Sequence, residues 1–93
     1  MLQLDWTESA ELDLADILGY VNARNPQAAE RIYAGIDKSL EIACEHPFLY
    51  KRSDRIPMAR EIVIQANYIV LYLAGEKIEV IAVVHARQNY PND

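Results

Sequence analysis

The sequence predicts an α+β fold. An N-terminal strand is followed by a two-helix antiparallel hairpin, which packs on one face of an antiparallel sheet whose last three strands form a meander. The last third of the chain holds three runs rich in β-branched and aromatic residues, separated by the short breaks Ala66-Asn67 and Gly75-Glu76. Breaks this short permit only hairpins. Two earlier segments have apolar residues at helical spacing, and a short alternating segment opens the chain.

The alternating segment at the start of the chain predicts the first strand. Leu2, Leu4 and Trp6 alternate with polar residues, which is typical of a half-buried strand. We expect this strand to join the sheet as an edge and Trp6 to belong to the core.

Two helices follow, each with a cap that the sequence predicts. Thr7 is the expected N-cap of the first helix, which stops over residues 22–24. Asn25 and Pro26 begin the second, and Pro47 ends it. The apolar stripes that should cover the sheet are Ala10, Leu14, Ile17, Leu18 and Val21, then Ala29, Ile32, Tyr33, Ile36, Leu40 and Ala43. We expect Tyr33 to lie in the core.

The strands of the meander are apolar on both faces. Side chains alternate along a strand, so each run divides into two sets. In the last run one set is expected to be Ile78, Val80, Ala82 and Val84. Helices can cover one face of such a sheet, and we expect the other face to need a partner.

The length and composition of the chain indicate a single globular domain spanning residues 1–93. The chain is 52% hydrophobic and 25% charged, which is not a disordered composition. No apolar run approaches the roughly 20 residues of a membrane helix, and the start lacks a signal pattern. We therefore expect no membrane contact and a cytoplasmic location. The lone Cys44 excludes an internal disulfide and is interpreted as a small buried hydrophobe.

Charge is unevenly distributed along the chain. Residues 1–45 hold nine acids and three bases, a net charge of −6, whereas residues 46–93 hold five acids and six bases, a net charge of +1. An acidic protein lacks the diffuse positive field that supports tight binding of phosphate backbones, so direct nucleic-acid binding is not expected. A local basic cluster consists of Lys51, Arg52, Arg55 and Arg60. Its loop members form either a solvated surface or a site for an acidic partner.

The common catalytic motifs are absent. The sequence has no phosphate-cradling glycine loop, nucleophile elbow or HExxH motif, and no cluster with metal-ligand spacing, so we expect no cofactor and no metal. His85 is either a strand-end residue hydrogen-bonded to backbone or a proton-transfer group for RNA cleavage beside Arg87. Arg60 is either the partner of a helix carboxylate, Glu11 or Asp13, or part of a binding site.

Several strings follow one another in the order strand, helical hairpin, loop and meander. They are Trp6-Thr7-Glu8-Ser9-Ala10, Asp13-Leu14-Ala15-Asp16-Ile17, Asn25-Pro26-Gln27-Ala28-Ala29, His46-Pro47, Arg55-Ile56-Pro57, Arg60-Glu61-Ile62-Val63, Tyr68-Ile69-Val70-Leu71-Tyr72 and His85-Ala86-Arg87-Gln88-Asn89-Tyr90-Pro91. Together they resemble ParE-type toxins of the RelE/ParE superfamily, the toxin half of bacterial type II toxin–antitoxin pairs. The resemblance covers nearly the whole chain.

That resemblance implies a RelE/ParE-like fold and a non-enzymatic toxin that inhibits DNA gyrase by protein–protein binding. It further implies a cognate antitoxin, ParD-like or similar, whose partly disordered C-terminal segment wraps the toxin. We expect this segment to lie along the sheet edge or in the groove beside the helical hairpin. DNA would be contacted only through the antitoxin. The target-binding candidates are Lys51, Arg52, Arg55, Arg60 and Arg87.

The alternative is a ribosome-dependent mRNA endoribonuclease of RelE type. Its catalytic residues would be His85, Arg60, Arg87 and Tyr90. The overall acidity is unlike such ribonucleases, which work among rRNA phosphates and favour basic surfaces. The common ParE turn, Pro-Gly-x-Arg-Glu, also reads Pro57-Met58-Ala59-Arg60-Glu61 here, which is expected to reshape the loop. RNA cleavage is therefore the second hypothesis.

Overall fold

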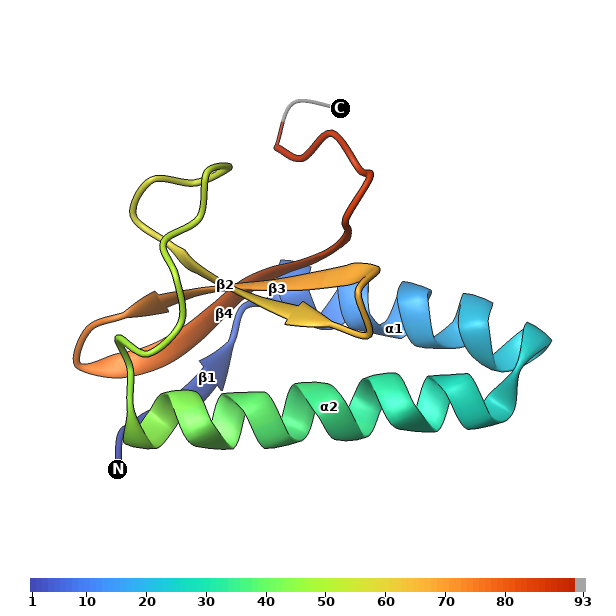
Figure 1. The fold of residues 1–93 in the computed structure, drawn as a ribbon, viewed down its shortest axis with the longest axis horizontal. Helices are drawn as coiled ribbons and strands as arrows, with labels where there is room; N and C mark the ends of the chain where they lie inside the picture. The colour runs from blue at the N-terminus through green and yellow to red at the C-terminus, as the bar shows by residue number, and fades with distance from the viewer. Residues whose placement is uncertain (92–93) are drawn as a thin grey trace.

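The computed structural model describes residues 1–91 and confirms the predicted α+β architecture. The sheet lies in the middle, with the helical hairpin on one side and the C-terminal segment on the other (Figure 1). The 46–59 loop begins at the end of α2 on the helix side and passes to the other side of the sheet. The elements in chain order are β1 (Gln3–Trp6), α1 (Glu8–Arg24), α2 (Pro26–Glu45), β2 (Arg60–Ile64), β3 (Tyr68–Ala74) and β4 (Lys77–His85).

The helical hairpin turns at a single residue, Asn25. Its backbone N–H donates to Val21 O at 2.7 Å, and its side-chain Oδ1 accepts from Ala28 N at 3.1 Å. Thr7 caps α1, with Oγ1 accepting from Ala10 N at 3.1 Å. These bonds satisfy polar backbone groups that have no partner within a helix. The predicted caps are confirmed.

The strand order in the sheet is β1-β4-β3-β2. β2, β3 and β4 pair antiparallel as the predicted meander. β1 occupies an edge as predicted but runs parallel to β4, with Leu4 opposite Ile78, so the sheet is mixed. The helical hairpin supplies the long connection that a parallel pair requires.

A β-bulge in β4 changes which residues share a face. Leu71 pairs with Ala82 and Tyr72 with Val80, which leaves Ile81 as an extra residue without a partner on β3. Two residues of β4 then lie opposite one residue of β3. Beyond the bulge, each side chain of β4 points to the face opposite the one that regular alternation predicts. The prediction that one face carries Ile78, Val80, Ala82 and Val84 is therefore wrong in its second half.

Asp13 of α1 supports β4 beyond the bulge. Pairing with β1 ends at Val80, and the backbone N–H of Val83 donates instead to Asp13 Oδ2 at 3.1 Å. Burial raises the pKa of the Asp13 carboxyl above its ordinary value. The helix carboxylate thus satisfies an edge N–H group of the sheet.

The turn between β2 and β3 is tight and contains no glycine. Gln65 and Ala66 both have positive φ angles, 51° and 64°. This left-handed conformation costs an L-residue about 1–2 kcal/mol. Asn67 N closes the turn by donating to Ile64 O at 3.2 Å.

The main core lies between the helices and the sheet. Tyr72 is fully buried there, and its hydroxyl donates to Pro47 O at 2.9 Å, while burial raises the pKa of that phenol. Cys44 is buried and Trp6 packs partly buried against the core, as predicted. Tyr33 is 56% exposed, so its assignment to the core is wrong. It lies on the side of the α2 stripe that faces solvent beside β1.

The face of the sheet that points away from the helices, here called the outer face, is covered by the chain itself. Ile56 from the loop and Tyr90 from the C-terminal segment pack against a second apolar cluster. That buried cluster consists of Ile69, Leu71, Ala82 and Val84. The expectation that this face needs a partner is therefore wrong for its centre, because two segments distant in sequence cover it. Val63 at the β2 edge remains 56% exposed.

Candidate functional site

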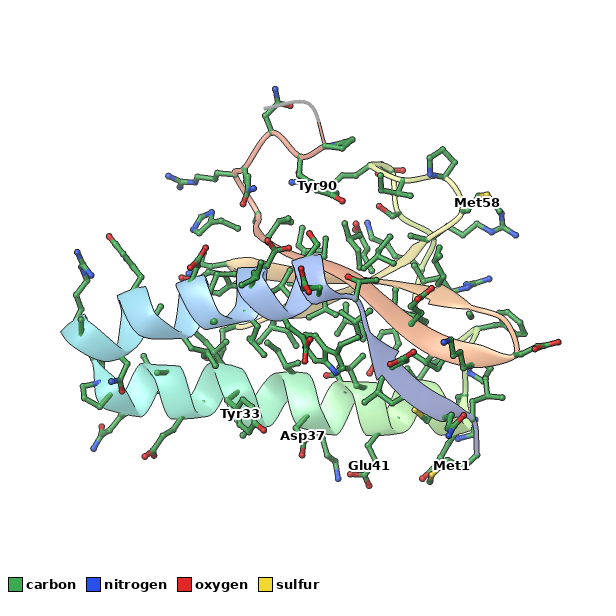
Figure 2. The ribbon with its side chains drawn as sticks, turned by 180° about the vertical axis from the view of Figure 1, so that it is seen from behind. Met1, Tyr33, Asp37, Glu41, Met58 and Tyr90 are labelled. Atoms are coloured by element: carbon green, nitrogen blue, oxygen red, sulfur yellow. The ribbon has the colours of Figure 1, made fainter. Side chains whose placement is uncertain are left out.

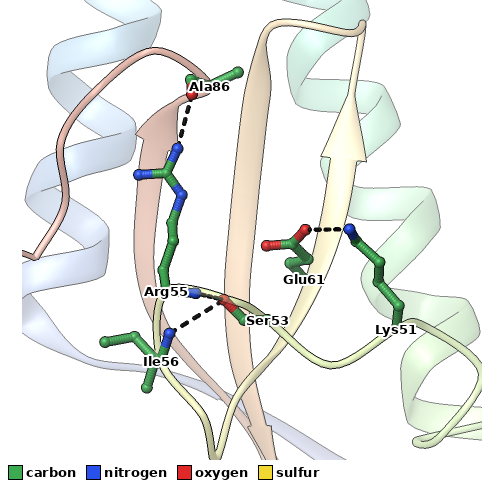
Figure 3. Close-up of polar contacts among 6 residues, drawn as sticks. All are labelled: Lys51, Ser53, Arg55, Ile56, Glu61 and Ala86. Atoms are coloured by element: carbon green, nitrogen blue, oxygen red, sulfur yellow. Dashed lines mark hydrogen bonds and ion pairs between the residues drawn. The ribbon is translucent and has the colours of Figure 1, made fainter.

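Arg55 fastens the loop to the C-terminal segment. Its guanidinium donates to Ala86 O at 2.7 Å, to Tyr90 O at 3.3 Å and to Gln88 O. Figure 3 shows the side chain reaching Ala86 across the outer face. We call Arg55 with these three carbonyls the Arg55 latch. Although Arg55 is a predicted target-binding residue, the latch engages its guanidinium within the protein.

Buried Ser53 fixes the loop conformation that directs Arg55. Its Oγ accepts from the backbone N–H groups of Arg55 at 3.0 Å and Ile56 at 3.3 Å (Figure 3). A serine hydroxyl that bonds backbone groups two and three residues ahead stabilises a local turn. The turn sets Ile56 over the outer face.

Lys51 is engaged in an ion pair. Its Nζ lies 3.1 Å from Glu61 Oε1 (Figure 3), and the Glu61 side chain is only 9% exposed. The hydrogen bond that Lys51 Nζ donates to the Glu61 carboxylate raises the pKa of the Lys51 ammonium. The positive charge of Lys51 is therefore balanced by a carboxylate of the sheet.

Arg60 is held against the loop and not against the helices. Its Nη1 donates to Tyr50 O at 2.7 Å and to Phe48 O at 3.4 Å, and its guanidinium lies 5.0 Å from the centre of the Phe48 ring. A salt bridge to Glu11 or Asp13 does not form, so that expectation is wrong. Asp13 lies on α1 beside β4, where it accepts from Val83 N, and β3 separates β4 from β2.

Arg52 lies directly opposite Arg60. The two residues form an antiparallel bridge, flanked by backbone hydrogen bonds from Ser53 N to Ala59 O and from Glu61 N to Lys51 O. These bonds extend the ladder of β2 into the loop. The backbone at the start of β2 is therefore paired with the loop along the edge of the sheet.

His85 takes the structural role predicted for a strand-end residue. Its Nδ1 accepts from Arg87 N at 3.1 Å, and its ring packs edge-on against Tyr68 with centroids 5.3 Å apart. The side chain of Arg87 is exposed, and Tyr90 packs partly buried on the outer-face cluster. Nδ1 therefore holds a backbone turn in this arrangement.

Of the residues proposed for RNA cleavage, His85, Arg87 and Tyr90 lie at one end of the meander and Arg60 lies at the other. Arg60 pairs with Tyr72, while His85 pairs with Tyr68, four residues further along β3. Strand spacing and rise per residue place the Cα atoms of Arg60 and His85 roughly 16 Å apart. The Arg60 guanidinium is also held towards Phe48 O and Tyr50 O. Arg60 is therefore not placed to share one phosphate with His85 in this arrangement.

An apolar groove of about 330 Å³ runs beside the helical hairpin, between α1, α2 and β1. Tyr33 and Asp37 project from the same stretch of α2 (Figure 2). The apolar lining of the groove includes Leu4, Trp6 and Leu14. Its carboxylates are those of Glu11 and Asp37. A groove beside the helical hairpin is expected from the sequence, but Tyr33 at its side is not, because the sequence pattern placed Tyr33 in the core.

One feature that sequence reasoning missed is the apolar part of the basic loop. Phe48, Leu49 and Met58 are 68%, 64% and 85% exposed. Large apolar residues beside prolines in a charged loop are a usable signal, because a purely solvated loop does not need them.

Within residues 1–91 no three His, Cys, Asp or Glu side chains gather closely enough to hold a metal ion. None of the helices in this range has the length and apolarity to cross a membrane.

Comparison with known proteins gives a consistent picture. The family model described as "ParE toxin of type II toxin-antitoxin system, parDE" matches residues 4–90. A protein of Sinorhizobium fredii named "Putative toxin Y4kP" is 32% identical over 90 residues, which cover 96% of this chain and 93% of that protein.

Two solved structures share the fold. The structure titled "Chromosomal ParDE TA system from P. aeruginosa" superposes with a TM-score of 0.74 at 18% identity, covering 91% of this chain and 96% of that one. The solution structure of a conserved hypothetical protein from Helicobacter pylori, HP0894, gives a TM-score of 0.55 at 13% identity, covering 95% and 98%. At these identities the likeness is one of fold.

Proposed function

Because the chain belongs to the ParE toxin family of type II toxin–antitoxin systems, we propose that it arrests bacterial growth by binding DNA gyrase and that a cognate antitoxin neutralises it. Residues 1–93 act as one domain in the cytoplasm, without catalysis. Contact with DNA occurs only through the antitoxin.

The separation of the candidate catalytic residues carries the non-enzymatic part of the proposal. General acid–base catalysis requires the proton-transfer group and the phosphate-binding cations within hydrogen-bond reach of one substrate. Here His85 Nδ1 accepts a backbone hydrogen bond and Arg60 is bound to the loop at the other end of the meander. This arrangement favours a binding surface over an active site.

The groove beside the helical hairpin suits the antitoxin. Its lining is mainly apolar, and Tyr33 adds an exposed aromatic ring at its side. A segment that folds on binding can place apolar side chains in such a groove. The carboxylates of Glu11 and Asp37 favour an antitoxin segment that carries lysine or arginine beside those apolar residues. A ParD-like C-terminal segment of this chemistry is the partner we propose.

The first test is expression of this chain alone in bacteria, with plasmid supercoiling and bulk protein synthesis followed in parallel. We expect gyrase-linked DNA damage while translation initially continues. In vitro, the purified protein should inhibit supercoiling by gyrase, and the antitoxin should restore it.

The matched control is the variant His85→Ala, checked for folding by circular dichroism. Toxicity should persist in this variant. Immediate translation arrest by the wild type, with mRNA cut at the ribosome and loss of both effects in the variant, would establish the ribonuclease hypothesis instead.

A further inference from the structure

Two arginines oppose each other at the start of β2 without a carboxylate between them. Arg52 and Arg60 form an antiparallel bridge, and directly opposed residues project to the same side of a sheet. Among residues 1–91 the ion pairs are Lys51–Glu61 and Lys77–Asp5, so neither arginine has an acidic partner in the described chain. Like charges in directly opposed positions destabilise a sheet. The pair of arginines therefore makes no evident contribution to the stability of the fold.

The same arginines line a hollow with an apolar wall. The hollow has a volume of about 240 Å³. Its lining is Phe48, Arg52, Pro57, Met58, Arg60 and Ala74, and we call it the arginine hollow. Phe48 is 68% and Met58 85% exposed. Apolar side chains this exposed beside unpaired cations are typical of an interaction surface.

One of the two cations is already positioned. Hydrogen bonds to Tyr50 O and Phe48 O hold the Arg60 guanidinium near the Phe48 ring. A guanidinium whose orientation is fixed before binding loses little conformational freedom when it meets a carboxylate. Arg52 is exposed and can close on the ligand from the opposite strand.

We propose that the arginine hollow binds an acidic segment of a protein, placing a carboxylate between Arg52 and Arg60 and an apolar side chain against Phe48 and Met58. Bidentate hydrogen bonding between guanidinium and carboxylate suits this arrangement. If the target is gyrase, this hollow is where an acidic segment of gyrase docks. That identification rests on the proposed function, whereas the chemistry of the ligand does not.

The surrounding charges favour a protein ligand over RNA. The chain carries a net charge of −5, and of the nearby cations Lys51 is paired with Glu61 and Arg55 is engaged by the latch. Two unpaired arginines can neutralise a carboxylate, but they do not provide the row of phosphate contacts on which backbone binding depends.

The hollow also lies apart from the groove assigned to the antitoxin. Figure 2 shows Met58 far from Tyr33 and Asp37, which lie along α2, and the hollow and the groove share no lining residue. The target and the antitoxin can therefore meet different surfaces of the toxin.

The test is a peptide selection. A phage-displayed library of random dodecapeptides is panned on the folded wild-type protein and counter-selected against Arg52→Glu. The expected consensus places Asp or Glu beside a large apolar residue. A peptide of that consensus should bind about tenfold more weakly to Arg52→Glu, since a hydrogen bond to a charged group corresponds to roughly this change in Kd. It should also bind about tenfold more weakly to Met58→Asp, because that variant loses an apolar contact and places a negative charge beside the acidic peptide. Lys38→Glu, which makes the same charge change on α2, should bind as wild type.

No enrichment over Arg52→Glu, a consensus without acidic residues, or equal weakening by Lys38→Glu would overturn the inference. So would displacement of the peptide by an oligouridine RNA that itself binds more tightly.

The supercoiling assay separates the two proposals. If gyrase is inhibited equally by wild type and Arg52→Glu, gyrase does not dock at the hollow and the proposed function stands. If the peptide binds as expected but gyrase is unaffected, the proposed target is wrong and the hollow stands.

Discussion

The Arg55 latch should contribute substantially to stability. Replacing Arg55 with alanine removes hydrogen bonds to the carbonyls of Ala86, Gln88 and Tyr90. Hydrogen bonds to charged groups contribute about 1.5–3 kcal/mol each, but these carbonyls lie in a partly exposed segment that water can reach, so we expect a total loss of about 2–4 kcal/mol. Tyr90 also leaves the outer-face cluster when the C-terminal segment is released.

A loss of this size is easily measured. A chain of this length has a free energy of unfolding of about 5–15 kcal/mol. The melting temperature of Arg55→Ala should therefore fall by roughly 10–20 °C. Urea unfolding followed by circular dichroism and by the fluorescence of Trp6, the single tryptophan, gives the free energy directly.

Two controls sharpen the experiment. Arg52→Ala removes an exposed arginine three positions away and should change stability by less than about 0.5 kcal/mol. In a double-mutant cycle, Arg55→Ala and Tyr90→Ala should be non-additive, because both release the same segment. The reasoning is refuted if Arg55→Ala costs no more than Arg52→Ala, or if the Arg55 and Tyr90 losses simply add.

Three further changes test other parts of the structure. Ala66→Gly should stabilise the protein by about 0.5–1 kcal/mol in urea unfolding, since glycine adopts a positive φ without strain; a loss of stability would contradict this. Tyr72→Phe should lower stability by about 1–2 kcal/mol because Pro47 O loses its donor; an unchanged melting temperature would refute it. The pKa of Asp13 is raised on folding, so its contribution is present below the unfolded pKa and is lost as pH rises through the folded pKa. Stability of Asp13→Asn relative to wild type should therefore increase from pH 3 to pH 7, and a flat difference would refute the assignment.

The local elements of this fold could be predicted from the sequence because their signals are local. Thr7 and Asn25 cap helices through hydrogen bonds to residues three positions away. The breaks after Gln65 and Ala74 are too short for anything but hairpins. The family resemblance likewise rests on strings and their order, and the family match over residues 4–90 confirms it.

The facing of side chains could be predicted only in part. Alternation assigns a face correctly as long as the strand is regular, as it is up to Val80. The position of the bulge in β4 depends on how the sheet bends against β1 and α1. The sequence around Ile81 contains no local signal for a bulge. One extra residue is enough to reverse the face of Ala82 and Val84.

The roles of the charged residues were decided by tertiary structure alone. Sequence shows that Lys51, Arg52, Arg55 and Arg60 form a basic cluster, but not which of them find partners. Folding brings carbonyls 31 to 35 residues away within reach of Arg55. It also pairs Lys51 with Glu61 and leaves Arg52 opposite Arg60. A long cationic side chain can meet any of several partners at similar free energy, so only the three-dimensional arrangement determines which charges remain available for binding.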